Sequence, residues 1–176
     1  MEKVIEKASA KFKGEFLLEC FRKGEKIWEE KAHNIVTNEG LDAILNIMLH
    51  GSTQITTWYC VISETNTAAA GTMTYGTPSF TETEAYDEAT RPAYNEAASS
   101  SQSVTNSANK AVFTISASKT LYGAGLVGGG TDPTVKSDKA GGGTLLCYAL
   151  FSSSRAVVDD DVVNLTYTIS AADDGV

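Results

Sequence analysis

The stretch at residues 161–170, DVVNLTYTIS, decides the fold because its residues alternate between apolar and polar more regularly than those elsewhere in the chain. In an extended chain successive side chains point to opposite faces, so the apolar members of the stretch share one face. They are Val163, Leu165, Tyr167 and Ile169. The stretch therefore predicts a β-strand with one face in a core and the other toward water.

Four more stretches predict strands. KAVFTISAS alternates, KTLYGAGLVG and TLLCYALFS are short and apolar, and ITTWYCVIS is β-branched and aromatic almost throughout. They occupy residues 110–118, 119–128, 144–152 and 55–63, respectively. Because 55–63 is so apolar, we expect its strand to be covered on both faces.

The first third of the chain predicts a hairpin and one helix. Residues 11–33 carry two apolar-rich runs around Gly24, which can take the positive φ of a tight turn. Residues 38–49 repeat apolar side chains at helical spacing, on one helix face, after the candidate N-caps Thr37 and Asn38. These apolar residues are Leu41, Ile44, Leu45, Met48 and Leu49.

Together these elements predict a mainly β protein, an antiparallel β-sandwich of Greek-key or jelly-roll type with one short α-helix at about 38–49. We expect residues 1–176 to form a single sandwich domain. Within it, 1–13 is a candidate N-terminal arm and 11–33 an added hairpin. The polar residues 64–103 predict long surface connections.

Composition narrows the classes of function. The net charge of −8 repels phosphates, which argues against a nucleic-acid partner. The charged N-terminus is unlike a secretory signal, and no stretch approaches a membrane span. We therefore expect a soluble protein made in the cytoplasm with no membrane partner. The three cysteines, Cys20, Cys60 and Cys147, lie in apolar runs and are interpreted as buried thiols.

The glycine-rich stretch 125–146, GLVGGGTDPTVKSDKAGGGTLL, raises the question of a phosphate-binding loop. Such a loop needs Lys and Ser or Thr directly after its glycines, and then a helix. Here a predicted strand follows instead. We therefore interpret the stretch as a mobile hairpin loop, which a partner could order on binding.

Acidic clusters are the remaining candidates for chemistry. Asp159, Asp160 and Asp161 could bind calcium, but they lack the alternating spacing of a calcium loop, and a solvated turn fits better. Four acidic residues could supply a general acid and base, although the sequence gives them no basic partner. They are Glu82, Glu84, Asp87 and Glu88. We expect no enzyme, no metal and no cofactor.

Aromatic residues offer two candidate binding surfaces. Trp58 and Tyr59 could form a sugar platform, but alternation places them on opposite faces of a strand and at least one in the core. Tyr and Arg in the polar connection YDEATRPAY have the composition of interface anchors, or they pack back over the sandwich edge. The interface candidates are Tyr86, Arg91, Pro92 and Tyr94.

Several stretches, taken in order, resemble a known group of proteins. They are NIVTNEGLDAILNIMLHGSTQITTWYCVIS, YDEATRPAYNEA, VTNSANKAVFTISASKTLYGAGLV and TLLCYALFSSSRAVVDDDVVNLTYTIS. This sequence is similar to small virion proteins of tailed bacteriophages, of the type that includes capsid cement or decoration proteins. The likeness runs from about Asn34 to Ala171, and the hairpin at 11–33 is an addition to the shorter members.

The resemblance implies a sandwich that binds the outer surface of the major capsid protein shell as a dimer or trimer and stabilises it. It places the protein on the capsid exterior of the virion. The candidate docking surfaces are 1–13, 64–103 and 128–143. One alternative is a phage tail or fibre module that recognises host-surface glycans. Another is a catalytic sandwich domain such as a hydrolase, which would have to use the acidic residues at 82–88.

Overall fold

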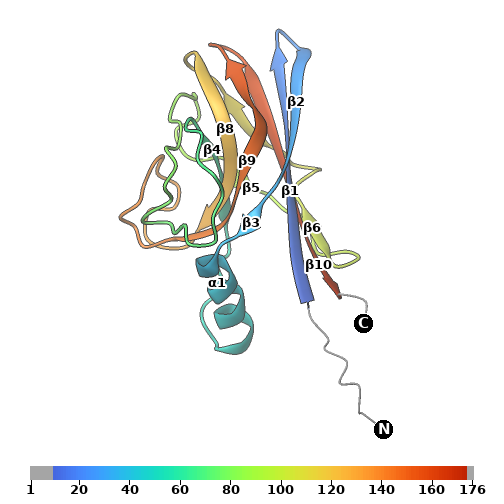
Figure 1. The fold of residues 1–176 in the computed structure, drawn as a ribbon, viewed down its shortest axis with the longest axis vertical. Coiled ribbons are helices and arrows are strands. Elements are labelled where there is room, and N and C mark those ends of the chain that lie inside the picture. The colour runs from blue at the N-terminus through green and yellow to red at the C-terminus, as the bar shows by residue number, and fades with distance from the viewer. Residues whose placement is uncertain (1–9, 174–176) are drawn as a thin grey trace.

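Two antiparallel sheets face each other in the computed structural model, which describes residues 10–173 (Figure 1). One sheet, sheet A, has the order β2-β1-β10-β6, with β7 also paired to β10. Its strands are β1 (Ala10–Arg22), β2 (Glu25–His33), β6 (Ser103–Thr105), β7 (Ala111–Thr114) and β10 (Val162–Asp173). The predicted mainly β sandwich is confirmed.

The second sheet, sheet B, has the order β3-β9-β8-β4-β5. Its strands are β3 (Ile35–Val36), β4 (Trp58–Ser63), β5 (Ala93–Tyr94), β8 (Lys119–Gly128) and β9 (Thr144–Val157). The strand predicted from ITTWYCVIS is β4, and it is covered on both faces as expected. Cys60 and Ile62 pack into the core between the sheets, whereas Val61 packs into a second apolar cluster on the outer face.

Strand β10 organises sheet A. Its alternation is confirmed, because Val163, Leu165 and Tyr167 are completely buried in the core between the sheets. Along its length it pairs with β1 from Phe21↔Val162 to Ala10↔Asp173. The register that the sequence pattern requires is therefore fixed by a long antiparallel ladder.

The predicted hairpin at 11–33 is confirmed and belongs to the sandwich itself. Lys23 and Gly24 both have positive φ, 52° and 85°, as in a two-residue turn of type I′. From β1, Phe16 and Leu18 lie fully buried in the core. The hairpin is therefore an integral part of the sandwich. Of the candidate N-terminal arm, residues 10–13 form the start of β1, and residues 1–9 lie outside the described part of the chain.

Hydrogen bonds link the two sheets where β2 passes β9. The buried Glu30 carboxylate accepts hydrogen bonds from the Ser152 N–H at 2.8 Å and from Arg155 Nε at 2.9 Å. The Trp28 indole N–H donates to the Ala156 carbonyl at 3.1 Å. Hydrogen bonds to Arg155 and Ser152 hold the pKa of Glu30 below its usual range in spite of its burial, so the carboxylate stays charged.

The single helix of the described residues, α1 (Asn38–Leu49), has the predicted bounds. Thr37 is its N-cap, and the Thr37 Oγ1 accepts a hydrogen bond from the Gly40 N–H at 2.9 Å. A Cβ on Gly40 would come within 2.4 Å of the Leu146 carbonyl oxygen, so glycine lets the first turn rest directly on β9. Beyond that turn the helix projects past the end of the sheets (Figure 1).

We predict that Leu18→Ala lowers the free energy of unfolding by about 3 kcal/mol, because it leaves a cavity in the common core. Urea denaturation followed by fluorescence measures the change. Val112→Ala, at an exposed site on β7, is the matched control and should cost less than about 1 kcal/mol. If the hairpin unfolded in a separate early transition and Leu18→Ala left the main transition unchanged, the hairpin would not be an integral part of the sandwich.

Candidate functional site

Two long connections lie over the outer face of sheet B (Figure 1). They comprise residues 64–92 and 129–143, and together we call them the loop layer. A second apolar cluster fills the space between them and the sheet. It contains Val61, Val127, Leu145 and Tyr148 from the strands and Met73, Tyr75 and Phe80 from the loops. The loop layer is therefore packed onto the sheet by its own small core.

A buried ion pair joins the parts of the loop layer. Arg91 Nη2 donates to Glu82 Oε2 at 2.6 Å and Arg91 Nε donates to Glu82 Oε1 at 2.9 Å. The two side chains are only 3% and 5% exposed. Charged groups are buried at this depth only when they are paired and hydrogen-bonded, and a two-pronged contact between guanidinium and carboxylate meets both needs.

The remaining donors of Arg91 reach the glycine-rich connection. Its Nη1 donates to the Pro133 carbonyl at 3.1 Å, and its Nη2 donates to the Asp138 carbonyl, also at 3.1 Å. Its Nη1 also donates to the Tyr75 hydroxyl, which in turn donates to Asp138 Oδ2 at 2.7 Å. One arginine thus holds three chain segments together.

The pKa values follow from this arrangement. Burial raises the pKa of Glu82, and the hydrogen bonds from Arg91 oppose that rise. Burial also raises the pKa of the Tyr75 hydroxyl to about 12, so it remains a proton donor at neutral pH. The hydrogen bond from Tyr75 lowers the pKa of Asp138, which keeps that acceptor charged.

The glycine-rich connection is anchored, which corrects the prediction of a mobile loop. Besides the contacts to Arg91, Asp138 Oδ2 accepts a hydrogen bond from the Gly141 N–H at 2.9 Å. A Cβ on Gly143 would lie 2.6 Å from the Tyr75 ring, so the backbone passes directly over that ring. The glycines permit close packing here. The sequence pattern could not distinguish this role from flexibility.

Three of the four predicted interface residues lie inside the protein. Tyr86 packs edge-on against Phe113, with ring centroids 5.1 Å apart, and the Tyr94 hydroxyl donates to the Tyr167 carbonyl at 3.2 Å. Tyr86, Arg91 and Tyr94 are all buried, and only Pro92 is partly exposed. Of the two alternatives, packing back onto the sandwich is the one that the structure shows for these three residues. There Tyr86 packs against Phe113, Arg91 pairs with Glu82, and Tyr94 bonds to the backbone of Tyr167.

Two of the four acidic residues at 82–88 hold neighbouring parts of the chain. Glu82 is bound to Arg91, and the Glu88 carboxylate accepts from the Thr114 N–H at 3.0 Å and the Thr114 hydroxyl at 2.9 Å. Glu84 and Asp87 are exposed. Within residues 10–173, no group of three or more His, Cys, Asp or Glu residues has a geometry suited to holding a metal ion.

The predicted turn at 159–161 is present, but the prediction that it is solvated is wrong for Asp161. Asp161 is buried, and its carboxylate accepts from Arg22 Nε at 2.7 Å, from Arg22 Nη2 at 2.8 Å and from the Val158 N–H at 2.8 Å. Asp159 and Asp160 face the solvent. Asp161 therefore fastens the turn between β9 and β10 to the end of β1.

The cysteines and the aromatic pair at 58 and 59 lie as predicted. Cys20, Cys60 and Cys147 are buried free thiols, and burial raises the pKa of Cys147 to about 12. Trp58 packs on the core between the sheets and Tyr59 on the cluster under the loop layer, so their rings lie on opposite faces of β4.

Sequence reasoning missed an apolar surface at the end of the sandwich from which α1 projects. Six large apolar side chains are exposed there, and we call them the end patch. They are Phe12 (38% exposed), Ile35 (44%), Leu41 (38%), Leu45 (55%), Met48 (72%) and Leu49 (80%). The helical pattern correctly placed four of them on one face of α1, but it could not tell that little would cover that face.

We predict that Arg91→Met lowers the free energy of unfolding by about 3 kcal/mol or more, because it leaves the Glu82 carboxylate buried without its partner. Removing both charges in the double variant Arg91→Met, Glu82→Leu should recover part of this loss. A double-mutant cycle by urea denaturation measures the coupling. If the two substitutions had additive effects on the free energy of unfolding, the ion pair would not be the contact that holds the loop layer together.

We also predict an acid-sensitive contribution from Asp161. Its hydrogen bonds from Arg22 lower its pKa in the folded state, so its contribution is present above the unfolded pKa of about 3.9 and is lost as the pH falls through the folded value. Asp161→Asn should cost about 1–3 kcal/mol at pH 7 and much less at about pH 2. Asp159→Asn is the exposed control. A loss of stability in Asp161→Asn that does not change with pH would exclude this role.

Comparisons with known proteins do not assign the chain to a family. No family model matches the sequence, and a search of curated proteins finds no match. Among the described residues, no helix has the length and apolar character needed to cross a bilayer. The function is therefore argued from the geometry and from the sequence motifs.

Proposed function

We propose that the protein is a virion structural protein, a capsid cement or decoration protein that binds the outer surface of a major capsid protein shell and stabilises it. The motif resemblance between Asn34 and Ala171 supports this assignment, and so does a sandwich whose polar surface is held in fixed shape. In this role the protein acts on the capsid exterior after synthesis in the host cytoplasm. It needs no catalytic group, cofactor, nucleic acid or membrane.

The observation that carries the proposal is that buried contacts hold the loop layer in one conformation. Binding costs free energy when loops must be ordered at the interface, and a surface that is already ordered avoids most of that cost. Arg91 and Glu82 bind each other and the backbone of the second connection before any partner arrives. The loop layer carries exposed hydroxyl groups, for example those of Thr72 and Thr77, and one exposed large apolar side chain, Val135. This mixture suits a polar protein–protein interface.

The physical task of such a protein is to add contact area across the junctions between shell subunits. A single contact of about 1,000 Å² can be weak, but an oligomer that holds several subunits gains an effective concentration worth about 100-fold or more. We therefore propose that the protein acts as a homo-oligomer. The net charge of −8 suits an outward surface that must stay soluble.

We predict that the purified protein binds expanded capsids saturably, with a fixed number of copies per particle. Val135→Asp places a charge in the proposed docking surface and should weaken binding roughly tenfold or more, because burial of such a side chain contributes about 1.5–3 kcal/mol. Co-sedimentation with capsids over a range of protein concentrations measures both stoichiometry and affinity.

Val158→Asp is the matched control, since Val158 is an exposed valine in the turn between β9 and β10. It should bind as the unaltered protein does. Binding that never saturates and disappears with moderate salt would exclude the cement function. Attachment to isolated tails and not to heads would favour the module that recognises host glycans. A loss in Val158→Asp without one in Val135→Asp would exclude the loop layer as the docking surface.

A further inference from the structure

We infer that the end patch is the surface through which two copies of this chain associate about a twofold axis, with α1 of each copy packed in a groove of the other. The biological role of this dimer rests on the proposed function, because two linked copies can hold two shell subunits at once. The association itself concerns the protein alone and is tested without capsids.

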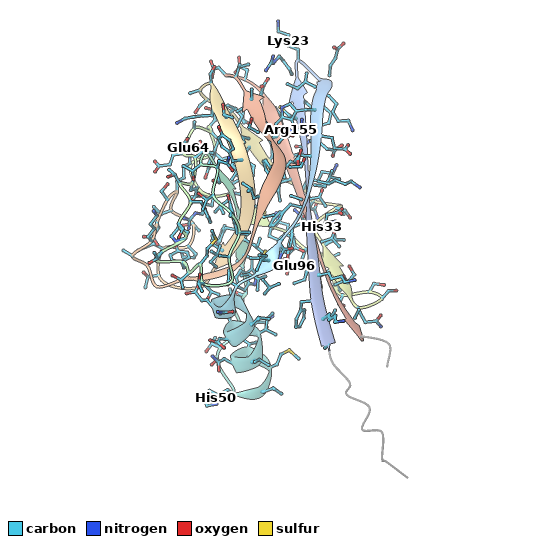
Figure 2. The ribbon with its side chains drawn as sticks, viewed as in Figure 1. Lys23, His33, His50, Glu64, Glu96 and Arg155 are labelled. Carbon is cyan, nitrogen blue, oxygen red and sulfur yellow. The ribbon has the colours of Figure 1, made fainter. Side chains whose placement is uncertain are left out.

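Most of the apolar face of α1 is uncovered. Only Ile44 among its five predicted apolar residues packs on the core between the sheets, while Leu45, Met48 and Leu49 are more than half exposed. The helix is fastened at its first turn and then extends away from the sheets, with His50 at its far end (Figure 2). An apolar helix face without a partner is typical of a surface that another protein covers.

A groove lies beside the helix. It has a volume of about 440 Å³ and lies between the start of β1, strand β3 and the first turn of α1. Phe12, Ile35, Val36 and Leu41 line it with apolar surface, and Lys11 and Lys13 stand at its strand side. The groove thus offers an apolar floor to a helix face and positive charge at one edge.

Charged residues of opposite sign border the end patch. Asp42 is exposed and flanks the apolar face of α1, and the helix carries no basic residue in its last turn. Lys11 and Lys13 are exposed and flank Phe12 in β1, where the strand borders the groove. In a twofold interface each side of the patch meets the other side of its copy. The acidic flank of one helix therefore meets the basic strand side of the other copy, and the patch is complementary to itself.

The size of the patch agrees with a dimer. Each of the six large side chains leaves on the order of 100 Å² exposed. Together with neighbouring polar atoms, this exposed area approaches the roughly 800 Å² that each partner buries in a stable interface.

The edge strand β2 is a poor alternative as the dimer interface. Its exposed side chains include Lys26, Glu29, Lys31 and His33, and charges along an edge discourage pairing with another strand.

The test is the oligomeric state of the purified full-length chain, measured by sedimentation equilibrium at about 50 µM, above the micromolar dissociation constants of weak interfaces. The expected mass is twice 18.7 kDa. The double variant Leu45→Lys, Met48→Lys should sediment as the monomer with an unchanged circular dichroism spectrum, because both residues are exposed in the monomer. Higher salt should not dissociate the dimer, because it screens both the contact of Asp42 with Lys11 and Lys13 and the repulsion between two copies of charge −8, and it leaves the apolar contacts in place.

Charge exchange tests the twofold geometry. Asp42→Lys and Lys13→Glu should each weaken the dimer several-fold, and the variant that carries both changes should regain most of the loss. Ile27→Lys is the matched control, since Ile27 is an exposed apolar residue in β2, in the hairpin whose turn residue Lys23 lies at the other end of the molecule from His50 (Figure 2).

A monomer at every concentration, a trimer, or a dimer that survives Leu45→Lys, Met48→Lys would overturn the inference. So would a dimer that only Ile27→Lys disrupts. Failure of capsid binding with an intact dimer would remove the proposed function and leave this inference standing. Saturable capsid binding by a monomeric protein would overturn this inference and leave the proposed function standing.

Discussion

Sheet B is apolar on both faces, and the rest of the structure depends on covering both. One face meets sheet A through Ile62 and Leu126, and the other carries Val127 and Tyr148 away from sheet A. A sandwich of two sheets can bury only the first of these faces. The second is covered by two long polar connections, which must themselves become ordered to exclude water. The buried contact between Arg91 and Glu82 and the apolar side chains beneath the connections hold them in place.

Most of the fold could be predicted from the sequence because local patterns encode it. Alternation in 161–170 identified β10, Gly24 marked the turn of the first hairpin, and Thr37 marked the start of α1. Each of these signals depends on neighbouring residues and needs no knowledge of distant contacts. The apolar character of residues 55–63 even predicted the double burial of β4.

The candidate site was harder to predict, because its contacts join residues far apart in the chain. Arg91 was correctly singled out, but nothing local shows that its partner would be Glu82 or that it would bind the carbonyl of Pro133. Glycine runs permit both mobility and close packing. At Gly143 the backbone packs closely because the Tyr75 ring lies directly beside it, and the local sequence does not show this contact. The uncovered face of α1 likewise depends on where the sheets end, which the helical pattern does not contain.

Two surfaces follow from this architecture: a locked polar layer on one face of the sandwich and an apolar patch at one end. On our account the first holds the capsid shell and the second holds another copy, so that affinity comes from shape and valency. A reconstruction of the intact virus particle, at a resolution that traces the chain, tests this most directly. We expect pairs of copies on the outer shell, joined at their helices with the loop layers against the major capsid protein. Copies confined to the tail, or an outer shell without this chain, would contradict the account.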